Sequence, residues 1–432
     1  MPSNPSRLPV QAQVPLPYTA SPTKLFFRDI FLCLKYCWAW LGILFPITPW
    51  KSGKLDELFP SPENFRDIVT HLFLVVLQLY FLISLPIFAF VLMFPVPWFI
   101  AYVTIILFIN YVACKFLLNG FGPIQHSKFP IEESEELKKE HWIFINGIGA
   151  GQHWLQSNLD RLSQTFCRRI SGVNNPTHGL VFDIIECLIQ RCFNYATEDI
   201  RTGYAMIKSA LLTGGYKKVV LILHSQGGIE GGMIMDWLLA ELPADTFRKL
   251  EIYSFANAAN HFNNPNRNFG QYFHDSMIDF RTTPAQTPET RCIPYIEHYA
   301  NSGDFVSLWG VLSFAGIPNR YMGEVFIRKG TGHLLNQHYL DTMFPLGPDG
   351  RVREHNKFID STITPGENEP VDENGKDEWD MLFSSLDDPT VDDPQSPAGR
   401  EALRFKTLWN KPVKVRDHSR LWQYRNGGSP KE

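Results

Sequence analysis

The sequence lacks any pair of cysteines at the Cys-x-x-Cys spacing that zinc sites and many redox centres use. Its seven cysteines are scattered along 432 residues, and three of them, Cys33, Cys37 and Cys114, lie in or beside apolar segments. This usage favours a reducing compartment and gives no sign of a metal site. A large excess of one charge is also lacking, because the net charge is -4, so nucleic acid is not an expected partner.

Two further absences concern the secretory route. The first two dozen residues are rich in Pro and Ser and lack a charged start, an apolar core and a cleavage site, so no signal peptide is expected. No Asn-x-Ser/Thr sequon occurs with a residue other than Pro in the middle. Both absences agree with a globular part that faces the cytosol.

The chain also has one long uncharged run, because no Asp, Glu, Lys or Arg occurs from Ile68 to Cys114. One membrane span needs roughly 20 apolar residues, so this run is long enough for two. The prolines of Phe94–Trp98 interrupt helix geometry and divide the run. We predict spans over about Val69–Phe94 and Trp98–Leu118.

The depth of this hairpin is left open by the sequence. Pro86 is compatible with a kinked full span and with a re-entrant wedge that enters one leaflet. A buried helical hairpin of a soluble protein is a third interpretation, but such a hairpin normally carries a polar stripe, and only Gln78, Ser84 and Asn110 interrupt this run. We therefore predict a membrane hairpin.

Basic residues flank the uncharged run on both sides, and the connecting turn has none. They are Lys51, Lys54 and Arg66 before the run and Lys115 and Lys128 after it. Positive flanks stay on the cytoplasmic side, so we expect the globular domain to face the cytosol, on the endoplasmic reticulum or another endomembrane. The earlier apolar segment Asp29–Trp50 is short and carries Lys35, which favours a place at the membrane interface.

From His141 onward, short apolar runs alternate with helical patterns. This alternation predicts an α/β domain with a mainly parallel sheet and flanking helices. The expected strands are His141–Gly149, His178–Ile185, Val219–Leu223, Leu250–Phe262, Ile293–Ser307 and Gly323–His333, and the expected helices include Gln152–Phe166 and Ala196–Leu212. In such sheets chemistry gathers beyond the carboxyl ends of the strands.

Composition divides the chain into seven parts. We expect an unstructured N-terminal segment (1–28), an interfacial segment and linker (29–67), the hairpin (68–118), a linker (119–140), the α/β domain (141–346), an acidic disordered segment (347–400) and a basic tail (401–432). The tail has three open interpretations: docking on the domain, binding to anionic headgroups, or full solvation.

One strand end carries the residues Leu223-His224-Ser225-Gln226-Gly227. A serine hydroxyl becomes a nucleophile only with an adjacent base, a group that orients the base, and donors for the oxyanion. A sharp turn between a strand and a helix exposes such a hydroxyl, and neighbouring glycines permit the crowding. The pattern Gly-x-Ser-x-Gly is met here except at its first position, where Leu223 stands.

This turn, with the strand before it, resembles the nucleophile turn of α/β-hydrolase lipases and esterases, and the resemblance covers roughly His141 to Leu346. It implies a serine, an acid and a histidine in that order. Asp304, in "ANSGDFVS" after a strand, stands where the family has its acid. His333, in the loop "KGTGHLL", stands where the family has its base, and His338 is the alternative base.

The resemblance also implies an oxyanion hole. Its donors would be the backbone N–H of Gln226 and one from Gly147 or Ile148, in the glycine-rich turn after the first strand. Asn146 stands where many lipases carry His. No cofactor or metal is implied.

Together these features predict a membrane-anchored serine hydrolase that cleaves ester or thioester bonds, with lipids as the expected substrates. Ser225 attacks, His333 serves as general base and then acid, and Asp304 orients the imidazole. The expected partners are an acyl-ester substrate and the membrane. The competing hypothesis is a non-catalytic membrane scaffold or binding protein that retains the hydrolase fold, and acyl transfer to an alcohol would use the same three residues.

Overall fold

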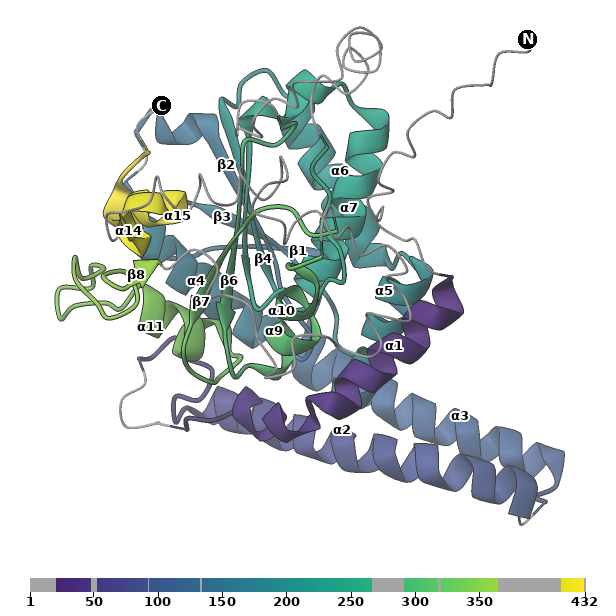
Figure 1. The fold of residues 1–432 in the computed structure, drawn as a ribbon. Coiled ribbons are helices and arrows are strands. Elements are labelled where there is room, and N and C mark those ends of the chain that lie inside the picture. Colours follow the sequence, from purple (N-terminus) through teal and green to yellow (C-terminus); the bar gives the residue numbers. More distant parts are fainter. Residues whose placement is uncertain are drawn as a thin grey trace, which may run out of the picture.

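A seven-stranded sheet forms the centre of the computed structural model, which describes residues 21–47, 53–91, 93–132, 134–265, 291–317, 320–363 and 413–430 (Figure 1). In spatial order the strands are β1 (Ile124–His126), β3 (Ile170–Val173), β2 (Glu140–Ile145), β4 (Lys218–His224), β5 (Leu250–Phe255), β6 (Tyr295–Asn301) and β7 (Glu324–Arg328). Only β1 pairs antiparallel within this sheet. The expected α/β-hydrolase-type architecture is confirmed.

Helices cover both faces of the sheet. One face carries α5 (Leu180–Phe193), α6 (Glu198–Leu212) and α7 (Gly227–Glu241), followed by the short α9 (Phe305–Trp309) and α10 (Val311–Phe314); the other carries α4 (Gln152–Phe166), η9 (Leu335–Leu340) and α11 (Asp341–Met343). The central strand β4 therefore packs Leu221 into one core and Val220 into the other. A strand buried on both faces reads as a continuous apolar run, which is why its sequence shows no alternation.

The prediction of a strand over His178–Ile185 is wrong. The segment forms the start of α5, and the neighbouring strand is β3 instead. The Asp183 carboxylate accepts the backbone N–H of His178 at 2.7 Å and the hydroxyl of Thr177, so these contacts stabilise the beginning of a helix. A short apolar run alone does not distinguish a strand from a buried helix turn.

The helix α1 (Pro22–Lys35) begins inside the segment 1–28 that we expected to be unstructured, with the Ser21 hydroxyl at its N-terminus. It docks on the domain through Asp29, whose carboxylate forms two 2.7 Å hydrogen bonds with Arg191. The Arg191 guanidinium also lies over the Trp309 ring. A fully buried pair of this kind needs such extra partners to offset desolvation.

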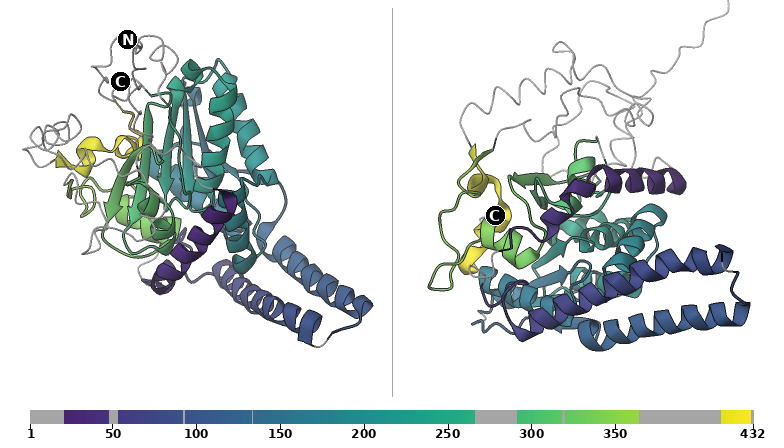
Figure 2. Two further views of the ribbon diagram at one scale, coloured as in Figure 1. Left: turned by 45° about the vertical axis from the view of Figure 1, so that its right-hand side comes forward. Right: turned by 90° about the horizontal axis from the view of Figure 1, so that it is seen from below.

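Two long helices follow and extend away from the domain (Figure 2). The first is α2 (Pro62–Pro86), which begins earlier than expected and continues as η4 (Ile87–Val91); the second is α3 (Val96–Ala113), which continues as η5 (Cys114–Asn119). By length and composition, Pro62–Phe90 and Val96–Asn119 are long and apolar enough to cross a membrane.

The end of the chain lies on the domain. The segments β9 (Val413–Lys414), α14 (Val415–His418) and α15 (Arg420–Gln423) bury Leu421 and Trp422, and Arg420 binds Glu251 at 2.9 Å. Residues 347–363, with β8 (Thr362–Ile363), pack there too, whereas the remaining acidic segment 364–400 lies outside the described residues. Of the three interpretations of the tail, residues 413–430 fit docking on the domain.

Candidate active site

Ser225 occupies a strained turn between β4 and α7. Its φ angle is +58°, a left-handed conformation that non-glycine residues rarely adopt. Its N–H donates to the Phe255 carbonyl at 3.0 Å, and its own carbonyl accepts from Gly228 and Ala258, so both neighbouring elements hold the turn. Strain of about 1–3 kcal/mol persists only where the surroundings enforce it, and such sites concentrate where chemistry occurs.

Glycines provide the space that this turn needs. A Cβ on Gly227 would lie 2.4 Å from the Ile145 carbonyl oxygen, and one on Gly228 would lie 2.0 Å from the Asn257 side chain. A Cβ on Gly231 would lie 2.5 Å from Leu223 Cδ1. The glycine one helical turn further along α7 therefore makes room for the leucine that replaces the first glycine of the pattern.

Three expected residues meet at the carboxyl edge of the sheet. His333 Nε2 lies 2.9 Å from Ser225 Oγ, and His333 Nδ1 lies 3.0 Å from Asp304 Oδ2. With its proton on Nδ1, the imidazole donates to Asp304 and accepts from Ser225. The geometry is therefore that of a nucleophile, a base and an orienting acid.

Asp304 is completely buried and fully hydrogen-bonded. Its Oδ1 accepts from the Val306 N–H at 3.0 Å, and its Oδ2 also accepts from the Tyr339 hydroxyl at 2.8 Å. Burial raises the pKa of Asp304, but His333 and these donors outweigh burial, so the pKa of this carboxyl lies below its usual range. Asp304 is thus an anion beside the imidazole.

His338, the alternative base, points elsewhere. Its Nδ1 accepts from the Leu334 N–H at 3.1 Å, and its Nε2 lies 3.2 Å from the Pro46 carbonyl oxygen. These two backbone contacts use both ring nitrogens. The structure therefore brings His333, and not His338, to Ser225.

His224 supports the base through its ring. The rings of His224 and His333 stack with centroids 4.9 Å apart, and His224 Nε2 donates to the His333 carbonyl at 2.9 Å. Burial, followed by the charge of His333, lowers the pKa of His224 to about 3, so this ring is neutral. His224 therefore packs against the base and holds the backbone of its loop.

The glycine-rich turn after β2 lies against the serine. A Cβ on Gly147 would be 2.4 Å from Ser225 Cβ, so only glycine fits there. Asn146 fixes the turn, because its side chain donates to the Ala150 carbonyl and accepts from the Asn175 N–H, both at 3.0 Å. Asn146 thus ties this turn to the segment that follows β3.

The amides expected to form the oxyanion hole, that of Gln226 and one from Gly147 or Ile148, are free. Within the described ranges, the backbone N–H groups of Gly147, Ile148 and Gln226 form no hydrogen bond with the protein. Gln226 follows Ser225 directly at the N-terminus of α7. Amides in this position are available to a developing negative charge.

A buried polar network lies behind Gln226. Asn175 Nδ2 donates to Gln226 Oε1 at 2.8 Å and to Glu230 Oε1 at 2.7 Å, and Gln226 Nε2 donates to Glu186. Burial, and then the nearby Asp199 carboxyl, raise the pKa of Glu230 well above its usual range. Burial and the neighbouring Asp199 carboxyl thus favour the protonated form of Glu230.

Sequence reasoning missed a contact from the N-terminal region. The carbonyl of Gly42 accepts from the Gly332 N–H at 2.8 Å, that of Ile43 accepts from the His333 N–H at 3.0 Å, and that of Phe45 accepts from the Thr331 hydroxyl. Residues 42–46, which we call the strap, thereby hold the loop of the base. Backbone contacts of this kind leave no signal in the sequence.

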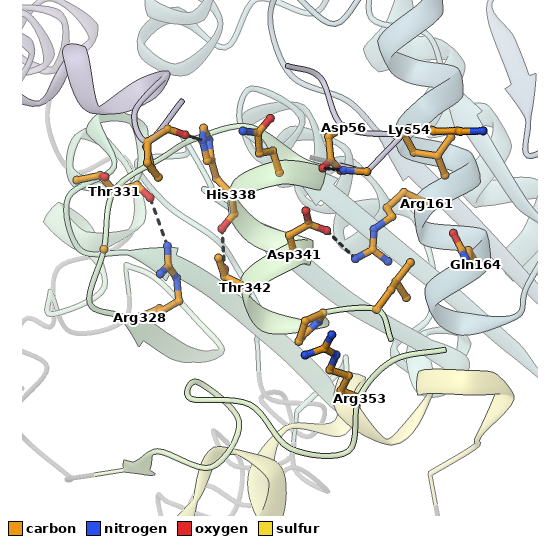
Figure 3. Close-up of a pocket in the computed structure, with 17 residues that line it drawn as sticks. Lys54, Asp56, Arg161, Gln164, Arg328, Thr331, His338, Asp341, Thr342 and Arg353 are labelled. Carbon is orange, nitrogen blue, oxygen red and sulfur yellow. Dashed lines mark hydrogen bonds and ion pairs between the residues drawn. The ribbon is translucent and has the colours of Figure 1, made fainter. Parts of the chain in front are cut away.

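A separate cavity of about 760 Å³, lined in part by charged side chains, lies beside the strap (Figure 3). Arg161 and Asp341 form an ion pair at 3.0 Å within it, and Arg328, His338 and Arg353 also line it. Ser225 does not line this cavity. Within the described ranges, no three His, Cys, Asp or Glu side chains come together as metal ligands.

The chain matches no protein-family model and no curated protein. Among solved structures, alpha/beta hydrolase domain-containing protein 10 from mouse is similar at 13% identity, over 49% of this chain and 85% of that one, with a TM-score of 0.25. At this TM-score and identity the match gives no information about the function of this chain. The chemistry of the site therefore rests on its own residues.

Proposed function

We propose that this protein is a membrane-bound serine hydrolase that cleaves ester or thioester bonds of lipids. The observation that carries the proposal is the continuous hydrogen-bonded path from Ser225 through His333 to Asp304, at 2.9 and 3.0 Å. The path ends at a strained serine at the N-terminus of a helix. Each part has a defined use in acyl transfer to water.

In this mechanism Ser225 Oγ attacks the acyl carbonyl carbon while His333 Nε2 takes the hydroxyl proton. The negative charge that forms on the carbonyl oxygen is stabilised by the N–H of Gln226 and by one from Gly147 or Ile148. The imidazolium then gives its proton to the leaving alcohol or thiol, which leaves an acyl-serine.

Water completes the cycle. His333 takes a proton from the water as it attacks the acyl carbon, and returns that proton to Ser225 Oγ when the acid is released. Asp304 stays ionised and stabilises the imidazolium in both halves of the reaction. No step needs a cofactor.

The proposal of a lipid substrate rests on where α2 lies. His71, on this helix, donates from Nε2 to the Gly149 carbonyl at 2.9 Å, so the candidate membrane helix contacts the same turn that carries Gly147. The basic residues Lys54 and Lys128 flank the apolar segment and support a cytosolic domain. An endomembrane location is part of the proposal.

The decisive experiment is labelling with a fluorophosphonate probe, which reacts with an activated serine. The full-length protein should be labelled, and Ser225→Ala should not. Ser209→Ala, on the exposed face of α6, is the matched control and should be labelled as the wild type is. Hydrolysis of a short acyl ester and of phospholipid vesicles would give the rates.

Burial of the serine favours a second candidate function. Ser225 is only 2% exposed, which suits a non-catalytic scaffold or binding protein that retains the fold. Folded wild-type protein that neither reacts with the probe nor hydrolyses either substrate, with lipid present, would establish that alternative and refute the hydrolase.

A further inference from the structure

The depth of the hairpin is limited by polar contacts midway along it. Gln78 Nε2 donates to Asn110 Oδ1 at 2.8 Å and to the His178 carbonyl at 2.6 Å, and Asn110 Nδ2 donates to the same carbonyl at 2.9 Å. We call Gln78, Asn110 and the His178 carbonyl the polar lock. Gly179 is essential to it, because a Cβ there would lie 2.1 Å from Gln78 Nε2.

Both helices remain attached to the domain on the near side of this lock. On α2, His71 binds the Gly149 carbonyl, and Asn64 accepts from the Trp154 indole at 2.9 Å. Beyond α3, Asn119 exchanges hydrogen bonds with the backbone of Thr177 at 2.8 and 2.9 Å. These parts of the hairpin lie against the protein, so they are not free to cross a bilayer.

Only the arms beyond the lock can enter lipid unaccompanied. They run from Gln78 to the end of η4 and from the start of α3 to Asn110. At about 1.5 Å per residue each arm is roughly 20 Å long. A bilayer is about 40 Å thick with its headgroup regions, or roughly 20 Å per leaflet, so each arm matches the depth of one leaflet and does not cross the hydrocarbon core of about 30 Å.

The tip has the chemistry of a segment that stays in hydrocarbon. Pro95 and Pro97 have no amide donor, and the N–H of Phe94 donates to the Phe88 carbonyl at 3.0 Å while the two rings stack. Val96 beside them is 69% exposed. A turn with few unpaired backbone donors and exposed apolar side chains is costly in water and tolerated in lipid.

Apolar surface continues from the hairpin onto the body of the protein. Along the docked part of α2, Leu72 and Val76 are more than half exposed, and on α1 Phe27 and Leu34 are too. In Figure 1, α1, α2 and α3 all lie along the lower side of the molecule. The contacts of His71 with Gly149 and of the strap with His333 place that side at the carboxyl edge of the sheet.

We propose that the hairpin is a wedge in a single membrane leaflet, and that α1 and the docked part of α2 rest on the same leaflet. Ser225 then lies at the level of that leaflet, and its substrate is a lipid acyl ester that enters sideways from it. The source of the substrate rests on the proposed function, whereas the wedge does not.

The test is accessibility of the tip in sealed vesicles. Cys37, the exposed native cysteine in the described part of the chain, is first replaced by Ser. Val96→Cys is then treated with a membrane-impermeant maleimide from the domain side and, in separate vesicles, from the opposite side. A wedge predicts labelling from neither side, and labelling only after the detergent dissolves the lipid.

Glu135→Cys, exposed on the domain, is the matched control and should react from the domain side alone. Reaction of Val96→Cys from the opposite side would establish a full span, and reaction from the domain side would mean that the tip lies in water; either result overturns the wedge. Met93→Cys repeats the test should Val96→Cys fail to fold. Fluorophosphonate labelling of the same samples reports Ser225 separately, so failure of the wedge and failure of the hydrolase are distinguishable.

Discussion

The hairpin and the carboxyl edge of the sheet are built in opposite ways. At the sheet edge Ser225, Asp304 and His333 are buried, and their polar atoms are hydrogen-bonded to each other. In the hairpin the polar residues Gln78 and Asn110 turn inward and apolar side chains face outward. The sheet edge thus buries its polar groups, whereas the outward face of the hairpin exposes apolar side chains, as expected of the proposed lipid-facing surface.

The two regions nevertheless share one turn. His71 of α2 binds the carbonyl of Gly149, which lies one residue after Ile148 and two after Gly147, the loop residues proposed to stabilise the oxyanion. Apart from this contact, Ser225, Asp304 and His333 bond to one another while Gln78 and Asn110 bond elsewhere. Changes in the sheet edge should thus affect chemistry with little effect on membrane binding, and changes in the hairpin should do the reverse. Each experiment below tests that separation.

The largest effect should follow replacement of the base. His333→Ala removes the proton acceptor of Ser225, and we expect kcat/KM to fall by about 10⁴-fold. His338→Ala, which removes only backbone contacts, should change it by less than about tenfold. Ester hydrolysis and fluorophosphonate labelling rates measure both. Equal losses in the two variants would contradict the assignment of His333.

A smaller loss should follow Gly147→Ala. The added methyl group would lie 2.4 Å from Ser225 Cβ and 2.9 Å from Oγ, so the loop or the serine must move. A displacement of about 1 Å in a reacting group costs about 100-fold in rate. Gly214→Ala, where nothing lies within 4 Å of the added methyl group, is the control. Unchanged labelling kinetics in Gly147→Ala would mean that this turn does not confine the nucleophile.

Sequence patterns could predict the strand ends of this fold, and therefore Ser225 and Asp304, because buried parallel strands end in small or polar residues. The choice between His333 and His338 could not be predicted, because it depends on how the chain turns into η9. The strap was invisible, because backbone carbonyls of any residue can form its bonds. Leu223 fits at the first position of the pattern because Gly231, on the following helix, leaves room for its side chain. No local sequence pattern reports a match of this kind between two elements.

The third effect concerns the polar lock. Gln78→Leu removes the hydrogen bonds that the Gln78 side chain forms with the Asn110 side chain, the His178 carbonyl and the Val181 N–H. We expect about 2–3 kcal/mol of lost stability, measured by unfolding in detergent. Leu79→Gln, on the outward face, should leave that stability within about 0.5 kcal/mol and weaken vesicle binding instead. If both variants behave alike, the inward and outward faces are not distinct.

The smallest effect should appear in the pH dependence of stability. Burial, and then the charge of Asp199, raise the pKa of Glu186 to about 7, with a Gln226 hydrogen bond opposing the rise. The folded pKa lies above the unfolded value of about 4.3, so this group's contribution to stability is fully present below the unfolded pKa and is lost as pH rises through about 7.

Glu186→Gln removes that titration. Relative to the wild type it should gain about 1–2 kcal/mol between pH 4 and pH 8, after allowance for the partial exposure of the side chain. Urea unfolding at several pH values measures this difference. Parallel curves for the two proteins would show that Glu186 is charged throughout, and that the network behind Gln226 holds a carboxylate rather than a carboxylic acid at neutral pH.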